Sequence, residues 1–504
     1  MRIHFVAVAG TGMGSVAGLF QSLGHDVSGS DTAFYPPMGP ALRRWGIRLL
    51  EGCDPKHLEP RPDLVVIGNV CRPWNAEARA AIDGGIPYAS MCQALADHVL
   101  PAYAPLVVGG THGKTTTSAM TAHLLREAGR DPGWLIGGIP KNFDESFHAS
   151  ARAVVTKPRK GALPIADPKT GGRGVPFVIE GDEYDTAFFE KTPKFWHYRA
   201  EVGVITSIEY DHVDIYPTPE AYDRAFQGFV DRLPTHGLLI ASASDPKIVA
   251  LARTAACEVM FYALDSDDTS GAPPHFLACP AEVGADGQTF DLFVGGVSAG
   301  RVALRVPGLH NVRNALAAIA GATAYGVEVR EAIAHLATFQ GVARRQELLF
   351  TAGGVNVYDD FAHHPTAVRE TLAALRAKHP KGALIAVFEP RSATACRAVH
   401  QAEYEACFGA ADRVLFPPLG RSDIPEAERL DLDRIVAAID RHGGRATREP
   451  SVDAIVETIT VEAKPGDTVA VLSNGAFGGI YEKLRAKLGG EKRSGGAPHE
   501  QRPV

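Results

Sequence analysis

The sequence lacks the features that mark disulfide-rich, membrane-spanning or nucleic-acid-binding proteins. Its seven cysteines are scattered over 504 residues and form no C-x-x-C pair, which argues against a disulfide framework or a zinc cluster and favours a reducing cytosol. No apolar run approaches the ~20 residues that span a bilayer. A net charge of -7, from 51 basic and 58 acidic residues, gives no field that would attract DNA. We therefore expect a cytoplasmic protein with no nucleic-acid partner and no membrane span.

The amino terminus superficially resembles a signal peptide, because Arg2 precedes an apolar stretch over residues 3–20. His4 and several glycines interrupt that stretch, whereas Ile3 to Val8 has the composition of a buried strand that runs into a glycine turn. We predict a strand here.

The length predicts about three domains, and an apolar share of 45% with 22% charged residues is ordinary for globular cores. Short apolar runs alternate with segments of helical period, which predicts an α/β protein with parallel sheets and with sites at the carboxyl ends of strands. The predicted strands lie at 3–8, 64–67, 106–108, 177–179, 202–205, 238–241, 355–358, 384–388, 413–416 and 468–472, with a β-rich patch at 276–306. The predicted divisions are 1–103, 104–339 with an inserted basic loop at about 152–174, 340–488, and a disordered tail at 489–504.

A glycine-rich loop follows the predicted strand at 106–108. Its glycines would turn backbone N–H groups onto phosphate oxygens, Lys114 would neutralise the terminal phosphate, and Thr115 would place a hydroxyl on magnesium. The loop is shorter than the standard G-x-x-x-x-G-K-[ST] pattern. Its residues are Gly110, Thr111, His112, Gly113, Lys114, Thr115, Thr116 and Thr117.

Acidic residues cluster at the end of the next predicted strand. Glu180, Asp182, Glu183 and Asp185 fall within six residues, and their mutual repulsion favours a magnesium site over a solvated turn. His212 follows the strand at 202–205 and would lie at the same sheet edge. For His212 a structural role and a functional role stay equally open on this logic alone.

A second glycine motif lies near the amino terminus. Gly12 to Ala17 satisfies G-x-G-x-x-[GA], and Asp31 follows at about the distance of a ribose-binding acid. This pattern supports a dinucleotide-dependent oxidoreductase as an alternative, with tight packing between strand and helix as the structural explanation. A separate phosphate loop in the same chain tells against the oxidoreductase.

The order of these motifs resembles the Mur ligase family of peptidoglycan synthesis over nearly the whole chain, from Gly10 to Gly479. Beyond the phosphate loop, the resemblance rests on the stretch 182–189, on Asp211-His212, on His310-Asn311 with Asn314, and on the stretch 358–366. It implies three domains: a Rossmann-like domain that binds UDP, a central P-loop ATPase domain and a Rossmann-like carboxyl-terminal α/β domain.

The resemblance also implies an activity and a set of site residues. The activity is ATP-dependent, magnesium-requiring ligation of L-alanyl-γ-D-glutamyl-meso-diaminopimelate to UDP-N-acetylmuramate through an acyl phosphate. This reaction serves recycling of the cell wall. We expect the protein to be a monomer. Lys114, Glu180 and His212 would be catalytic, with Thr115, Glu180 and His212 as metal ligands. The implied ATP contacts outside the loop are His310, Asn311, Arg345 and Asp359. The implied UDP-sugar contacts are Gly10, Thr11, Gly12, Met13, Gly14, Ser30 and Asp31, and we assign the acceptor peptide to Arg391 and His364.

Two features depart from the family pattern. Ser207 stands where relatives carry an asparagine, which puts one polar contact in doubt, and the insertion is longer than expected. No lysine occurs in 221–229, so we predict no carbamylated lysine. Ligation of L-alanine instead of the peptide remains the main alternative activity.

Overall fold

The computed structural model describes residues 1–153, 172–284 and 286–490. The chain forms two compact units, Met1–Ala343 and Arg344–Val504. The first two predicted domains both lie in the first unit, but each has its own sheet. Most of the predicted insertion and nearly all of the predicted tail lie outside the described residues.

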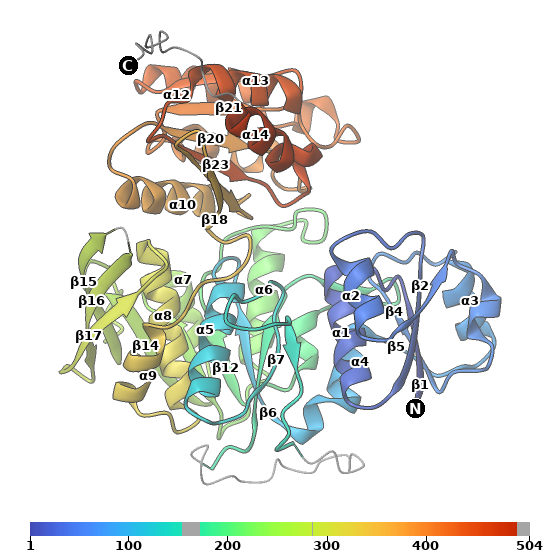
Figure 1. Ribbon diagram of the computed structural model, residues 1–504. Helices are drawn as coiled ribbons and strands as arrows, with labels where there is room; N and C mark the ends of the chain where they lie inside the picture. The colour runs from blue at the N-terminus through green and yellow to red at the C-terminus, as the bar shows by residue number, and fades with distance from the viewer. Residues whose placement is uncertain (154–171, 285, 491–504) are drawn as a thin grey trace, which may run out of the picture. The chain divides into compact units, whose positions relative to one another are not determined.

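The first sheet is parallel, with strand order β3-β2-β1-β4-β5. Figure 1 shows α3 on the opposite side of this sheet from α1, α2 and α4. The order reverses between β1 and β4, which places a ligand-binding crevice at the carboxyl ends of these strands. The strands are β1 (Arg2–Val6), β2 (Asp26–Asp31), β3 (Arg48–Glu51), β4 (Leu64–Ile67) and β5 (Tyr88–Ser90); the helices are α1 (Thr11–Ser22), α2 (Met38–Arg44), η1 (Pro55–Leu58), α3 (Ala76–Asp83), α4 (Met91–His98) and η2 (Leu100–Ala102).

The second sheet has ten strands, in the order β17-β16-β15-β14-β13-β12-β6-β9-β7-β8. Strands from β14 to β7 are parallel, and β15 to β17 form an antiparallel meander where the sequence predicts a β-rich patch. The strands are β6 (Ala104–Gly109), β7 (Gly133–Leu135), β8 (Phe147–His148), β9 (Pro176–Gly181), β12 (Val202–Ile205), β13 (Leu238–Ser242), β14 (Glu258–Leu264), β15 (Phe276–Gly284), β16 (Gly287–Val294) and β17 (Val297–Leu304), beside a separate hairpin of β10 (Asp185–Ala187) and β11 (Glu190–Pro193).

Helices cover both faces of this second sheet. Apolar side chains of α5, α8 and α9 pack on one face, and those of α6 and α7 pack on the other, where the core continues into α1 and α4 of the first sheet. The helices are α5 (Lys114–Glu127), η4 (Lys194–His197), α6 (Pro219–Val230), α7 (Pro246–Ala252), α8 (Leu309–Thr323) and α9 (Val329–Leu336). This continuous core ties the first two sheets into one unit.

The second unit is built on a six-stranded sheet in the order β18-β19-β23-β20-β21-β22, parallel except for β18. Helices α10 to α12 pack on one face, and α13 and α14 pack on the other. The strands are β18 (Glu347–Ala352), β19 (Val355–Asp360), β20 (Leu384–Phe388), β21 (Arg413–Phe416), β22 (Arg445–Arg448) and β23 (Thr468–Leu472); the helices are α10 (Pro365–Lys378), η5 (Ala398–His400), α11 (Gln401–Ala406), η6 (Glu426–Glu428), α12 (Leu432–Arg441), α13 (Val452–Glu462), η7 (Phe477–Gly479) and α14 (Ile480–Gly489).

The predicted α/β class with parallel sheets is confirmed, and each predicted strand has a counterpart. The amino terminus is a buried strand followed by a helix, as the interrupted apolar stretch predicts. Over the described part of the chain, no helix combines the length and the apolar composition that crossing a bilayer requires.

Candidate active site

The loop between β6 and α5 leaves backbone N–H groups available to an anion. Gly110 and Gly113 have φ angles of 141° and 81°, which side chains disfavour, and a Cβ on Gly110 would lie 2.0 Å from Thr206 Oγ1. Gly113 caps α5 without a side-chain hydrogen bond, and the first turn of α5 holds no acidic residue. The positive end of α5 therefore faces the loop, an arrangement that suits a phosphate group.

The segment that follows β12 holds this loop in place. The Thr111 hydroxyl donates to the carbonyl of Glu209 at 2.9 Å, and the His112 N–H donates to Ser207 Oγ at 2.8 Å. The His112 ring lies 3.5 Å from the Glu209 carboxylate. Ser207, the residue that departs from the family pattern, thus supplies a polar contact to the loop.

Glu180 lies near the end of β9, the strand beside β6 in the sheet. Its carboxylate accepts hydrogen bonds from the Thr115 hydroxyl at 3.0 Å and from the Gly137 N–H at 2.6 Å. A hydroxyl and a carboxylate in contact at the mouth of a phosphate loop are oxygen donors of the kind that Mg²⁺ prefers. The two residues fit the predicted metal site.

Glu183 occupies a central position for which the sequence analysis assigned no individual role. Its carboxylate is fully buried and lies 2.9 Å from Lys114 Nζ and 3.1 Å from His212 Nε2. The Tyr222 hydroxyl donates to it at 3.3 Å, and the Tyr216 hydroxyl donates to the Glu183 carbonyl. The acidic cluster was the available signal, but only the fold shows which of its members meets the lysine.

The charges of this group stabilise one another. Burial by itself would raise the pKa of Glu183, but the charge of Lys114 and the hydrogen bond from His212 outweigh burial and hold that pKa below its usual value. Burial would likewise lower the pKa values of Lys114 and His212, yet Glu183 raises both. Lys114 also donates to the carbonyl of Gly110, so its ammonium group is held within its own loop.

The predicted catalytic residues thus form two neighbouring contacts rather than one cluster. Thr115 pairs with Glu180, whereas Lys114 and His212 both meet Glu183. His212 has a φ of 53°, which is uncommon for a residue with a side chain. Residues held in such conformations cluster at functional sites, where the surrounding structure maintains them.

A second buried ion pair fixes the turn that carries Glu183. Lys194 Nζ lies 3.0 Å from an Asp182 carboxylate oxygen and 3.9 Å from the centre of the Tyr184 ring. Lys194 is 7% exposed, so these contacts are shielded from water. The residues on either side of Glu183 are therefore anchored to η4.

The hairpin β10–β11 connects this turn to the first sheet. Phe188 and Phe189 pack on the apolar cluster beneath β1 and β4, and the Phe189 ring meets Tyr88 edge-on, with centroids 5.2 Å apart. Asn69, after β4, donates to Asp185 at 3.3 Å. The acidic turn is thereby fixed relative to the carboxyl ends of the first sheet.

The glycine motif at 10–14 lies at the switch point of that first sheet. Gly10 precedes α1, which starts at Thr11 with no side-chain cap and no acid in its first turn, so its N–H groups are available to phosphate. Met13 is buried, and a Cβ on Gly14 would lie 2.3 Å from Met38 Sδ. Asp31 accepts from the Ala9 N–H at 2.9 Å, and Ser30 is fully buried. Ser30 and Asp31 therefore support the loop from behind.

Two of the predicted ATP contacts, His310 and Asn311, lie at the start of α8. Asn311 is 5% exposed, and its side chain donates to the Pro307 carbonyl at 2.7 Å and accepts from Asn314 at 3.2 Å. Asn314 in turn accepts from the Thr117 hydroxyl at 3.2 Å. Asn311 thus belongs to a network that joins α8 to α5, while His310 is half-buried before it.

Four predicted site residues belong to the second unit. Asp359 lies at the end of β19, 3.1 Å from the Arg344 guanidinium, and burial raises its pKa. Arg345 lies 5.0 Å from the centre of the Phe361 ring. His364 caps α10, and its ring meets that of His400 edge-on. Arg391 is exposed after β20, against Gly475.

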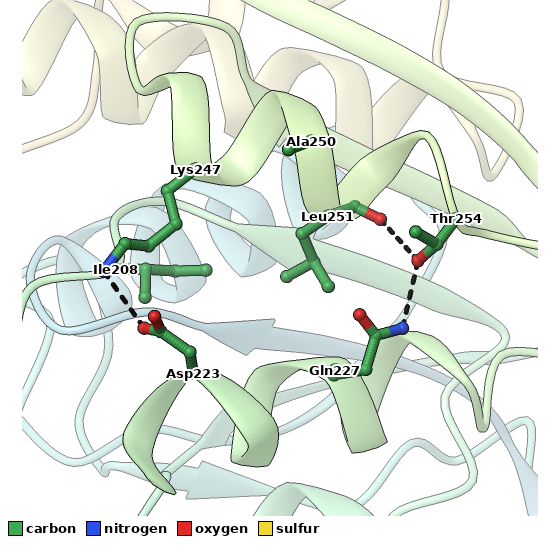
Figure 2. A pocket seen from close by; sticks show the side chains of 7 residues that line it. All are labelled: Ile208, Asp223, Gln227, Lys247, Ala250, Leu251 and Thr254. Atoms are coloured by element: carbon green, nitrogen blue, oxygen red, sulfur yellow. Dashed lines mark hydrogen bonds and ion pairs between the residues drawn. The ribbon is translucent and has the colours of Figure 1, made fainter. Parts of the chain in front are cut away.

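A hollow of about 260 Å³ between α6 and α7 is separate from these residues (Figure 2). Its lining polar side chains already pair with one another: Lys247 lies 3.1 Å from Asp223, and Gln227 donates to Thr254 at 3.0 Å. The nucleotide site is placed at the phosphate loop instead, where the uncapped amino end of α5 faces the anion.

Comparisons with known proteins identify relatives over nearly the whole chain. Residues 2–103 match the Mur ligase family catalytic domain, residues 108–322 the Mur ligase middle domain, and residues 344–475 the Mur ligase glutamate ligase domain. The chain is 38% identical over 485 residues to the UDP-N-acetylmuramate–L-alanyl-gamma-D-glutamyl-meso-2,6-diaminoheptandioate ligase of Escherichia coli K12, covering 96% of this chain and 97% of that protein. It is 35% identical over 501 residues to the UDP-N-acetylmuramate–L-alanine ligase of Chloroflexus aggregans, covering 96% and 98%.

The fold has a matching solved structure. The crystal structure of a murein peptide ligase from Psychrobacter arcticus superposes with a TM-score of 0.70 at 34% identity and covers 97% of this chain and 99% of that one. These full-length matches leave the dinucleotide-dependent oxidoreductase without support. The chain belongs to the Mur ligase family.

Proposed function

We propose that this protein is an ATP-dependent ligase that joins L-alanyl-γ-D-glutamyl-meso-diaminopimelate to UDP-N-acetylmuramate. The observation that carries the proposal is full-length similarity to ligases with that printed activity, at 38% and 35% identity, in Escherichia coli and Haemophilus influenzae. The contacts of Lys114, Thr115 and Glu180 at one sheet edge support phosphoryl transfer as the chemistry. We also propose a cytoplasmic location and a monomeric state.

The reaction needs two covalent steps because a free carboxylate has a poor leaving group. The lactyl carboxylate oxygen of the sugar attacks the γ-phosphorus of ATP, the bond to the β–γ bridging oxygen breaks, and ADP leaves. The amino group of the peptide then attacks the acyl carbon, phosphate leaves, and the amine loses a proton. Amide and inorganic phosphate are the products.

The residues of the middle domain have distinct parts in this scheme. Lys114 places its ammonium on the transferring phosphoryl oxygens, where negative charge develops in the transition state. The Thr115 hydroxyl, Glu180 and His212 would hold Mg²⁺, and the ion would screen the charge of the ATP phosphates. The N–H groups of Gly113 and of the first turn of α5 orient those phosphates. His310, Asn311, Arg345 and Asp359 are proposed to complete the ATP site.

The acceptor peptide carries several carboxylates and therefore calls for cations. Arg391 has an exposed guanidinium at the carboxyl end of β20, in the unit that follows the ATPase domain, and a guanidinium can grip a carboxylate through two parallel hydrogen bonds. His364, at the carboxyl end of β19, is the second proposed acceptor residue. Gly10 to Gly14, supported by Ser30 and Asp31, would bind the UDP part of the sugar.

L-Alanine is the second candidate acceptor, since several relatives at 32–35% identity carry the name UDP-N-acetylmuramate–L-alanine ligase. The test measures phosphate release by the full-length protein with ATP, Mg²⁺ and UDP-N-acetylmuramate, adding either L-alanine or the tripeptide. We expect release with the tripeptide only, and a loss of at least about a hundredfold in the Lys114→Ala variant. Release with L-alanine alone would assign the other activity, and near wild-type turnover by Lys114→Ala would end the phosphate-loop assignment.

A further inference from the structure

A buried polar cluster lies beneath the first sheet, away from the ATP site. The Glu77 side chain is fully buried, and one of its oxygens lies 3.2 Å from His4 Nε2 and 2.9 Å from His57 Nδ1. Its other oxygen accepts a hydrogen bond from the Ser30 hydroxyl at 2.6 Å. The cluster joins α3, β1, η1 and β2, and the proposed mechanism uses none of its charged members.

Net stabilisation is a weak explanation for this cluster. Its surroundings are apolar, because Val6, Val65, Ile67, Ala78 and Ala81 form the core on this side of the sheet. Buried charged groups cost solvation, and well-packed apolar residues in their place are often neutral or stabilising. A carboxylate retained here, with each oxygen bonded to a defined partner, instead fixes the positions of those partners.

The bond to Ser30 leads directly to the glycine loop. The Ser30 carbonyl accepts from the Val8 N–H at 3.0 Å, and the carboxylate of the next residue, Asp31, accepts from the Ala9 N–H at 2.9 Å. Ala7, where β1 enters this loop, has a φ of 65°, which is uncommon for a residue with a side chain. A loop in such a conformation keeps its shape only when the surrounding structure holds it.

We propose that Glu77 is a positioning residue for the UDP-sugar site, which acts through the Ser30 hydroxyl to hold the loop from Ala7 to Gly10 in its binding conformation. The inference rests on the proposed function, which assigns UDP to the loop. His57 bonds only the other carboxylate oxygen and does not lie on this path. It therefore provides a matched control within the same cluster.

The test measures binding of UDP-N-acetylmuramate to the full-length protein by isothermal titration calorimetry, without ATP. Glu77→Met, which keeps the side-chain volume, and Ser30→Ala should each weaken binding about tenfold, the size expected for one lost hydrogen bond. The double variant should bind no more weakly than Glu77→Met alone, because both changes break the same path. His57→Phe should lower the melting temperature and leave the affinity unchanged. The KM for ATP should stay constant in all variants.

Each other outcome has a defined meaning. Wild-type affinity in both Glu77→Met and Ser30→Ala overturns the inference, as do additive losses in the double variant or an equal loss in His57→Phe. If Glu77→Met does not fold, Ser30→Ala decides the question, because the fully buried Ser30 hydroxyl bonds Glu77 and cannot touch the nucleotide itself. Failure of the wild-type protein to bind the sugar nucleotide would instead refute the proposed function, so the two failures are distinguishable.

Discussion

Glu183→Gln tests whether the buried carboxylate is the charge partner that holds Lys114 in the resting protein. The substitution keeps the shape of the side chain and removes its charge. Lys114, whose side chain is 12% exposed, would then keep its positive charge without the carboxylate that now lies 2.9 Å away. We expect the free protein to lose stability and ATP to restore part of it, since the phosphates bring the missing negative charge.

The magnitude follows from the geometry. Two unit charges 2.9 Å apart attract each other by about 6 kcal/mol at an effective dielectric constant of about 20. Part of that attraction is offset by the desolvation of both groups, and removing one partner of a buried pair typically costs about 3–5 kcal/mol. The free energy of unfolding of Glu183→Gln should fall by this amount.

Asp185→Asn provides the matched control. Asp185 belongs to the same acidic turn and pairs with Lys191, but the Lys191 side chain is 64% exposed. The Asp185 side chain itself is 13% exposed, but a pair whose cation stays in water contributes close to what exposed pairs do, about 0–1 kcal/mol. Asp185→Asn should therefore change stability only slightly, although it removes the same formal charge.

The assay is urea-induced unfolding of each protein, with and without saturating ATP and Mg²⁺. Glu183→Gln should gain more stability from the nucleotide than the wild type does, because a ligand that binds only the folded state stabilises it by mass action. Equal stability of Glu183→Gln and Asp185→Asn would refute the charge-partner role. An equal gain from ATP in the wild type and Glu183→Gln would show that the phosphates do not replace the carboxylate.

Two further predictions address the acceptor site and the dependence of stability on pH. Arg391→Ala should raise the KM for the tripeptide roughly thirtyfold, the equivalent of about 2 kcal/mol, with the KM values for ATP and UDP-N-acetylmuramate unchanged in steady-state kinetics. Gly475→Ala should act in the same direction, since its Cβ would lie 1.5 Å from Arg391 Nη1. Equal weakening toward all three substrates would contradict a specific role of Arg391 in acceptor binding. Burial lowers the pKa of His123, so the folded protein binds fewer protons than the unfolded chain. The stability that this group contributes is therefore present above a pH of about 6.5 and is lost as the pH falls below that value. His123→Gln should reduce the slope of unfolding free energy against pH below about pH 6.5, by up to about 1.4 kcal/mol per pH unit. An unchanged slope in denaturant titrations would contradict the assignment.

The sequence by itself determined the features that depend on neighbouring residues. Strands at 64–67, 202–205 and 384–388 were predicted with the bounds that the structure gives, because a parallel strand covered on both faces is a continuous apolar run. The phosphate loop was predictable for the same local reason: glycines, a lysine and threonines within a few residues set its backbone and its charge.

Only the tertiary structure decided the features that join residues far apart in the chain. β2 has the polar sequence Asp26 to Asp31 and no apolar run, and it is a strand because its backbone pairs with β1 and β3. Ser28 and Ser30 on this strand bond His4 and Glu77 from other elements. Glu183 was one of four acids in a cluster, and its position between Lys114 and His212 required β6, β9 and β12 to lie side by side. Local patterns specify which backbone a segment adopts, whereas the partner of a buried charge is set by the packing of segments that the sequence separates.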